Sequence, residues 1–207
     1  GGAFAGMWKV VSHQGLGRIT IIKIINSTFV AATFALSSTS TADKYGLEPH
    51  HMGYLSTSNS LISLFVQSFA VATVAKRLGE ERCLQLGIAV AILQCLIEAN
   101  THSIYIYVAL MPFRVMSSNV ITQMFEILFT DMIPPEEGAA ALGSLGLLKS
   151  IARVSGPLYG GLLVGYVQPH MGLNSRAFVE AGHNVVILLM LLACFPLHAP
   201  KAKLKKE

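Results

Sequence analysis

The feature that most constrains this chain is a series of long apolar runs. The cleanest of them, Met52–Ala75, contains no charged residue between His51 and Lys76. A helix needs about 17 to 25 mostly apolar residues to span the hydrocarbon core of a bilayer. Six runs approach or reach this length: Ile19–Thr41, Met52–Ala75, Cys83–Glu98, Ile104–Thr130, Gly138–Tyr166 and Phe178–Leu197. We therefore predict an all-α membrane protein with six transmembrane helices.

The composition agrees with this prediction. Hydrophobic residues make up 53% of the 207 residues, charged residues 13%, and the mean hydropathy is +0.57, which is far too apolar for a soluble domain. The connectors are short and leave no room for a soluble domain. The three cysteines, Cys83, Cys95 and Cys194, show no CxxC or Cys/His spacing. We expect no disulfide, no metal site, no cofactor and no enzyme activity.

Basic residues predict the orientation, because Lys and Arg gather in cytoplasmic loops. With six spans, most loop Lys and Arg fall on the side of the two chain ends, whereas the opposite side carries only Lys44 and Arg176. Both ends are predicted to be cytoplasmic, and the net charge of +4 reflects topology and not nucleic-acid binding. Residues 1–18 are expected to link to a missing N-terminal half, 19–197 to form the bundle, and 198–207 to form a basic tail that contacts membrane lipid.

Four basic residues lie inside the predicted spans: Lys23, Arg114, Lys149 and Arg153. A charge inside a span is costly and usually faces a water-filled cavity or a partner. Lys23 lies about one helical turn from the membrane surface, so its side chain is expected to snorkel outward. Arg114 and Arg153 lie at similar depths near the midplane, and Lys149 is one turn from Arg153 on nearly the same face. These three are predicted to line a cavity.

Acidic residues that neutralise these charges are scarce. Glu126 is the only acid well inside a span, whereas Glu98, Asp131 and Glu180 lie at span ends. The interior is thus predicted to be net positive. Either the missing part of the protein supplies carboxylates, or the cavity receives an anionic group.

Polar residues on the fourth span share one helical face. Asn119, Gln123 and Glu126 are spaced i, i+4 and i+7, which predicts a cavity wall, although the two amides serve equally well for helix packing. Glu126 either exchanges a proton or forms a gating ion pair with Arg77 or Arg82, and its place near the cytoplasmic mouth favours the ion pair. The predicted substrate- or proton-binding residues are Arg114, Asn119, Gln123, Glu126, Lys149 and Arg153.

Small residues recur in the fifth span, in the stretch GSLGLLKSIARVSGPLYGG. They let helix backbones approach closely, and a proline lets the span bend. The spacing resembles the antiporter motif on the fifth helix of drug–proton exchangers of the major facilitator superfamily. The matching positions are Gly143, Ala152, Gly156, Pro157, Gly160 and Gly161, with Ala152 in place of one glycine.

A second resemblance to this superfamily lies between the second and third spans, in ATVAKRLGEER. Arg77, Gly79 and Arg82 fit the superfamily's cytoplasmic loop pattern. Four positions depart from it: Ala72, Lys76, Glu80 and Glu81. Such erosion is usual in the second copy of the pattern. The resemblance therefore implies the C-terminal six-helix half of a twelve-helix fold, in which this loop acts as a gate.

Longer stretches, GYLSTSNSLISLFVQ and LGSLGLLKSIARVSGPLYGGLL, together with NVIT, resemble the organic-cation-transporter-like proteins of solute carrier family 22. This resemblance implies a multi-pass plasma-membrane protein that exchanges organic cations or drugs for protons by alternating access. Its implied partners are small organic solutes, protons and the N-terminal half of the same protein.

Two other functions are alternatives. One is a membrane scaffold that transports nothing. The other is a rhomboid-type intramembrane serine protease, with Ser155 of RVSG as the nucleophile and His183 as the base. Against the protease, Arg153 occupies the position of the first glycine of its GxSG motif, and no second signature supports it.

Overall fold

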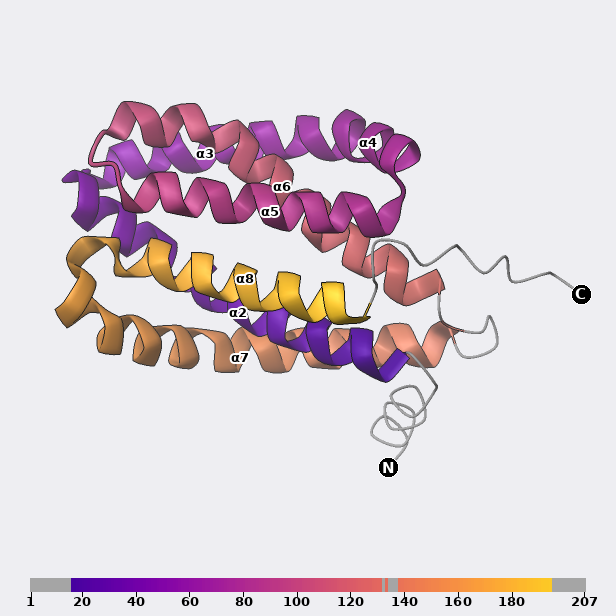
Figure 1. The fold of residues 1–207 in the computed structure, drawn as a ribbon. Coiled ribbons are helices and arrows are strands. Elements are labelled where there is room, and N and C mark those ends of the chain that lie inside the picture. The colour runs from indigo at the N-terminus through magenta and orange to yellow at the C-terminus, as the bar shows by residue number, and fades with distance from the viewer. Residues whose placement is uncertain (1–15, 132, 134–137, 195–207) are drawn as a thin grey trace, which may run out of the picture.

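The computed structural model describes residues 16–131, 133 and 138–194, and all regular structure in this part is helical. Long helices run side by side along one axis (Figure 1). In chain order they are α2 (Leu16–Tyr45), α3 (Pro49–Phe65), α4 (Val71–Leu78), α5 (Glu80–Ala99), α6 (Ile104–Asp131), α7 (Gly138–Met171) and α8 (Ser175–Cys194). A π-helical turn, η1 (Val66–Ala70), joins α3 to α4, and a 3₁₀ turn, η3 (Gly172–Asn174), joins α7 to α8.

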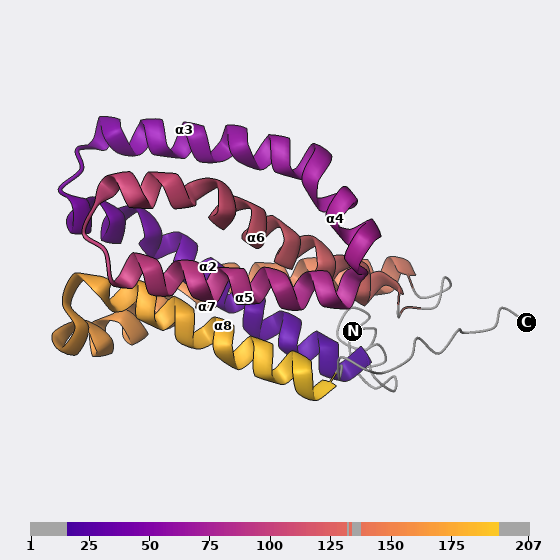
Figure 2. The same cartoon turned by 45° about the horizontal axis from the view of Figure 1, so that its top comes forward.

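Four segments of the described chain are long and apolar enough to cross a membrane. They are Gly17–Tyr45, Glu80–Ala99, Ile104–Asp131 and Leu145–Cys194, and the last takes in most of α7 and all of α8. The run Met52–Ala75 is helical throughout, but η1 divides it. A π turn interrupts the α-helical hydrogen bonding, and the rod bends there (Figure 2). The structure is thus that of an all-α membrane protein.

The connections alternate between two ends of the bundle (Figure 1). At one end, which we call the Gly79 end, lie the α4–α5 turn, the start of α2 and the end of α8. At the other, which we call the η3 end, lie η3, the α2–α3 turn and the α5–α6 connector. Gly79 has a φ of 79° and a ψ of 157°, a conformation that only glycine adopts readily, so the sharp turn into α5 depends on it.

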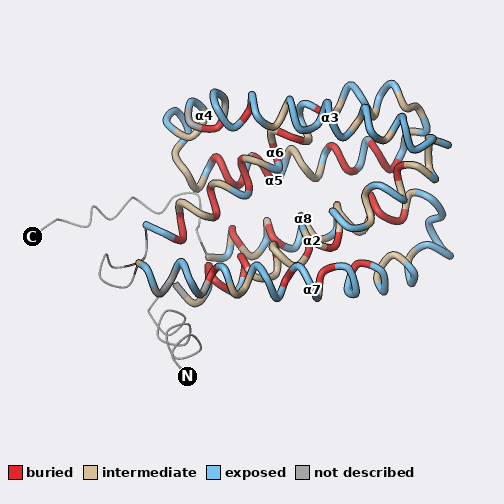
Figure 3. Tube along the Cα trace, turned by 180° about the vertical axis from the view of Figure 1, so that it is seen from behind, coloured by how far each residue is buried: buried red, intermediate tan, exposed pale blue. Residues whose placement is uncertain are grey.

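The apolar core fills the space between α2, α5, α6 and α8. Its most deeply buried side chains are Ile19, Ile22, Leu84, Ile88, Met124, Phe125, Phe129, Ile187 and Leu191. By contrast, α3 has no buried residue, and Figure 3 shows it exposed along the edge of the bundle. Because exposed apolar surface inside a membrane meets lipid or another protein segment, the whole length of α3 is available for such contacts.

Helix boundaries differ from the predicted ones, most clearly at two places. The short third run, Cys83–Glu98, belongs to a 20-residue helix that begins at Glu80, with Glu80 and Glu81 favourably placed in its first turn. The predicted connector after Tyr166 is largely helical, because α7 continues through Pro169 to Met171. A proline removes only one helical hydrogen bond and bends the helix, which membrane helices tolerate. Residues 1–15 and 195–207, with the expected linker and basic tail, lie outside the described part.

Candidate functional site

Glu126 of α6 and Lys149 of α7 form an ion pair towards the Gly79 end of the bundle. Lys149 Nζ donates a hydrogen bond to Glu126 Oε1, and the two side chains are 47% and 41% exposed. Because this bundle covers the pair only in part, the pair is less firmly held than a fully buried one, so either partner separates more easily. Glu126 was predicted to pair with Arg77 or Arg82, but in this structure its partner is Lys149 of α7, and both arginines are exposed.

Lys23 of α2 lies near this pair but is buried. It is only 5% exposed, and its Nζ has no hydrogen-bond partner among the described residues. The ammonium lies 5.2 Å from the centre of the Phe129 ring on α6, a cation–π contact. The expectation that Lys23 snorkels to the membrane surface is therefore wrong, because α2 packs with this residue facing α6.

Asn119 lies in a hydrogen-bond cluster between α6 and the α3–η1 rod. Its side-chain oxygen accepts a bond from Gln67 Nε2 at 2.9 Å, and its Nδ2 donates to Ser63 Oγ at 3.1 Å and to the Val115 carbonyl at 2.8 Å. Gln123, one turn further along α6, is half-buried. The predicted polar face of α6 is thus present, and Asn119 joins two helices within it.

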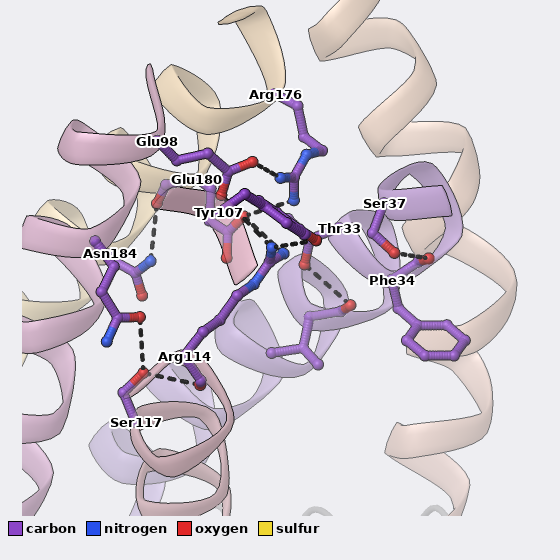
Figure 4. Close-up of polar contacts among 12 residues, drawn as sticks. Thr33, Phe34, Ser37, Glu98, Tyr107, Arg114, Ser117, Arg176, Glu180 and Asn184 are labelled. Atoms are coloured by element: carbon purple, nitrogen blue, oxygen red, sulfur yellow. Dashed lines mark hydrogen bonds and ion pairs between the residues drawn. The ribbon is translucent and has the colours of Figure 1, made fainter. Parts of the chain in front are cut away.

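Arg114 of α6 lies in a second charged cluster, closer to the η3 end. Figure 4 shows its guanidinium directed at Glu98 of α5 and Glu180 of α8, beside Tyr107. Arg114 Nη1 lies 3.5 Å from Glu98 Oε2 and 3.2 Å from Tyr107 Oη, and Arg114 Nη2 lies 3.8 Å from Glu180 Oε2. Arg176 of α8 pairs with Glu98 and, at 3.2 Å, with Glu180. Two arginines and two glutamates therefore neutralise one another across three helices.

This cluster changes the predicted charge balance. Glu98, which lies at a predicted span end, is 6% exposed, and Arg176, predicted as a loop charge, is 3% exposed. Lys44, the other predicted loop charge, donates to the Glu98 carbonyl and ties the end of α2 to the cluster. Arg114 consequently has both of its counter-charges within this chain. A signal in the sequence was available, because Arg176 and Glu180 are spaced i, i+4 at the start of α8.

The small residues of the antiporter-like motif divide into two groups. Gly156 and Gly160 pack α7 against α2: a Cβ added at Gly156 would come within 2.6 Å of the Ala31 Cβ, and one at Gly160 within 2.8 Å of the Ala32 Cβ. Ala152, one turn earlier, is buried. A Cβ on Gly143 or Gly161 would meet nothing within 4 Å, and Pro157 is exposed within α7. The close helix approach predicted from the motif is present, and its partner is α2.

The remaining predicted site residues face outward. Arg153 lies one turn beyond Lys149 and is exposed, and no described residue forms an ion pair with it. The structure therefore does not bring Arg153 together with Arg114, which lies in the other cluster. Arg77 and Arg82 flank Gly79 at the α4–α5 turn. Their gating role stays a prediction.

Ser155 and His183, the residues of the protease alternative, are not paired. Ser155 Oγ donates to the Ile151 carbonyl at 3.0 Å. His183 instead shares a hydrogen bond with Tyr159 at 2.5 Å and stacks on Phe29, with the ring centres 4.2 Å apart. A serine–histidine nucleophile needs the two side chains within hydrogen-bonding reach, so this arrangement gives the protease no support.

Comparison with known proteins identifies the family. Solute carrier family 67 member A1 from Homo sapiens is 28% identical over 166 residues, which cover 77% of this chain and 37% of that protein. The chain thus aligns with little more than a third of that relative. No solved structure shows significant similarity. The finer resemblance to solute carrier family 22 stays a prediction. The profile of the Major Facilitator Superfamily matches residues 19–207, so the chain belongs to that superfamily.

Proposed function

We propose that the chain is the C-terminal six-helix half of a secondary active transporter that exchanges protons for small organic solutes by alternating access. The N-terminal half of the same protein completes the solute cavity. The resemblance to solute carrier family 22 implies that the solutes are organic cations or drugs. In this proposal both ends of the piece are cytoplasmic, and the protein resides in the plasma membrane.

The observation that carries this proposal is the half-exposed pair of Glu126 and Lys149. A carboxylate inside a helix bundle takes one positive partner at a time: a proton, the Lys149 ammonium or a cationic group of the solute. Ligands that compete for one site exclude each other, and such exclusion between proton and cation is what exchange requires. Both side chains are partly exposed, so a solute can reach them.

Glu98 and Glu180 are less suited than Glu126 to exchange a proton for a cation. Glu98 and Glu180 are held by Arg114 and Arg176, and Glu98 is almost fully buried. Breaking a buried ion pair costs several kcal/mol, whereas an exposed pair opens at little cost. Glu126 is therefore the acid best able to bind and release a proton or a cation in turn. The arginine–glutamate cluster is better suited to hold the helices together.

The packing of α7 on α2 supports alternating access. Gly156 and Gly160 bring the two helices into backbone contact, so Lys149 on α7 and Lys23 on α2 are held on one rigid pair of helices. Rocking of this half against the other would expose the charged site first to one side of the membrane and then to the other.

Uptake into proteoliposomes tests the proposal. The complete transporter, its Glu126→Gln variant and a control, Glu48→Gln, whose carboxylate is exposed at the η3 end, are compared under an imposed pH gradient. The solutes are tetraethylammonium and a panel of amine drugs. We expect gradient-driven uptake by the wild type and the control, and its loss in Glu126→Gln. The absence of flux for every compound would favour the non-transporting scaffold.

A further inference from the structure

Lys23 has no anionic hydrogen-bond partner among the described residues. Its side chain is buried, and its ammonium has three donors but no hydrogen-bond acceptor among the described residues. The Phe129 ring at 5.2 Å offers a cation–π contact and no hydrogen bond. Burying an ammonium that is not paired with an anion costs free energy inside a membrane protein. A negatively charged group beside Lys23 would therefore stabilise it.

The charged groups that act on Lys23 are Glu126 of α6 and Lys149 of α7. Glu126 is already paired with Lys149, so the three side chains together carry one unbalanced positive charge. Arg153, one turn beyond Lys149 on α7, adds another exposed cation without an ion-pair partner in the described chain. The site as it stands therefore has an acid, Glu126, whose partner is displaceable. Beside it is a lysine, Lys23, whose ammonium has no hydrogen-bond partner in the described chain.

We propose that the transported solute carries both a cationic group and a carboxylate. The cationic group takes the place of Lys149 on Glu126, and the carboxylate is held by Lys23 together with the released Lys149. This inference rests on the proposed function, since it assigns the solute class of the same site.

A solute with a single charge fits this site less well. A simple cation on Glu126 would leave the ammonium groups of Lys149 and Lys23 without an anion, where their repulsion is weakly screened. A simple anion would satisfy Lys23 but would compete with the Glu126 carboxylate for Lys149. A zwitterionic solute gives each of its own charges an opposite charge in the site and supplies Lys23 with an acceptor.

Thermal unfolding of the complete transporter without solute is the first test. Lys23→Met removes the ammonium but keeps the length of the side chain. If Lys23 has no anionic partner in the empty transporter, this variant melts at a higher temperature than the wild type. A lower or unchanged melting temperature would mean that a carboxylate elsewhere in the protein already neutralises Lys23, and would overturn the inference.

Uptake of matched solute pairs is the second test. Tyramine and tyrosine, tryptamine and tryptophan, and agmatine and arginine each differ by one carboxylate. Under an imposed pH gradient, the wild type should prefer the member with the carboxylate by about tenfold or more in KM, the range expected for hydrogen bonds to a charged group. Lys23→Met should lose this preference and still take up the amines. Lys23→Arg and the control Lys76→Met, at an exposed lysine, should retain it.

The uptake results separate a failure of this inference from a failure of the proposed function. Proton-driven uptake of amines and organic cations with no preference for the carboxylate, or with a preference that Lys23→Met leaves unchanged, would overturn this inference and leave the proposed function standing. The absence of proton-driven uptake for every compound would overturn both.

Discussion

Arg176 of α8 and Glu98 of α5 form an ion pair that links two helices inside the bundle, and their side chains are only 4% and 8% exposed. Removing one partner leaves the other charge buried, which costs about 3–5 kcal/mol. Arg176→Met should therefore lower the melting temperature of the purified protein markedly, because Arg114, at 3.5 Å, would be the one ion-pair partner left to Glu98 among the described residues.

Arg82→Met serves as the control for this change, because Arg82 is exposed at the α4–α5 turn. The double variant Glu98→Gln/Arg176→Met removes both charges and should lose less stability than the sum of the two single variants. Equal melting of Arg176→Met and Arg82→Met would show that the pair contributes nothing to the fold.

Gly156 should tolerate no side chain. Its ideal Cβ would lie 2.6 Å from the Ala31 Cβ and 2.9 Å from the backbone nitrogen of Ala32, so Gly156→Val forces α7 away from α2. Overpacking of this kind costs about 1–3 kcal/mol or more. The variant should insert into membranes but melt early and lose transport. Gly161→Val, on the same helix but facing open space, should keep both properties.

The sequence predicted where the helices lie, because long apolar runs favour helices in a membrane. The run Met52–Ala75, predicted as the cleanest span, is helical but divided by η1, and it is not among the four described segments long and apolar enough to cross. It also predicted the close approach at Gly156, since small residues in a span let another helix pack closely against it. Pairings between distant spans were not predictable. The sequence placed Arg114 in a cavity and Arg176 in a loop, whereas Glu98 and Glu180 neutralise both. Which residues meet depends on how the helices rotate about their axes, which spacing along one helix does not define.

Gly79 should be required for the turn between α4 and α5. With φ at 79° and ψ at 157°, a residue with a Cβ is strained by about 1–3 kcal/mol. Gly79→Ala should therefore destabilise the protein, although no neighbouring atom lies within 4 Å of the added methyl group. Gly53→Ala, within α3 and equally free of contacts, should instead stabilise by about 0.5–1 kcal/mol. Thermal unfolding of the two variants measures the change in stability. A change of the same sign in both variants would contradict this prediction.

Lys149 and the cationic group of the solute compete for the Glu126 carboxylate. If Lys149 is the partner that a cationic group displaces, then removing Lys149 frees the carboxylate. Lys149→Met should therefore bind a transported cation more tightly than the wild type, by roughly two- to fivefold, the value of an exposed ion pair.

The most direct measurement is the Kd of such a cation for the complete transporter, determined by calorimetry at one pH for the wild type, Lys149→Met and Arg153→Met. Arg153 is an exposed cation one turn away without an ion-pair partner in the described chain, so its removal reports the general effect of losing a positive charge. Tighter binding by Lys149→Met than by Arg153→Met is the result we predict. Binding by Lys149→Met that is weaker than the wild type, or equal to that of Arg153→Met, would contradict the account.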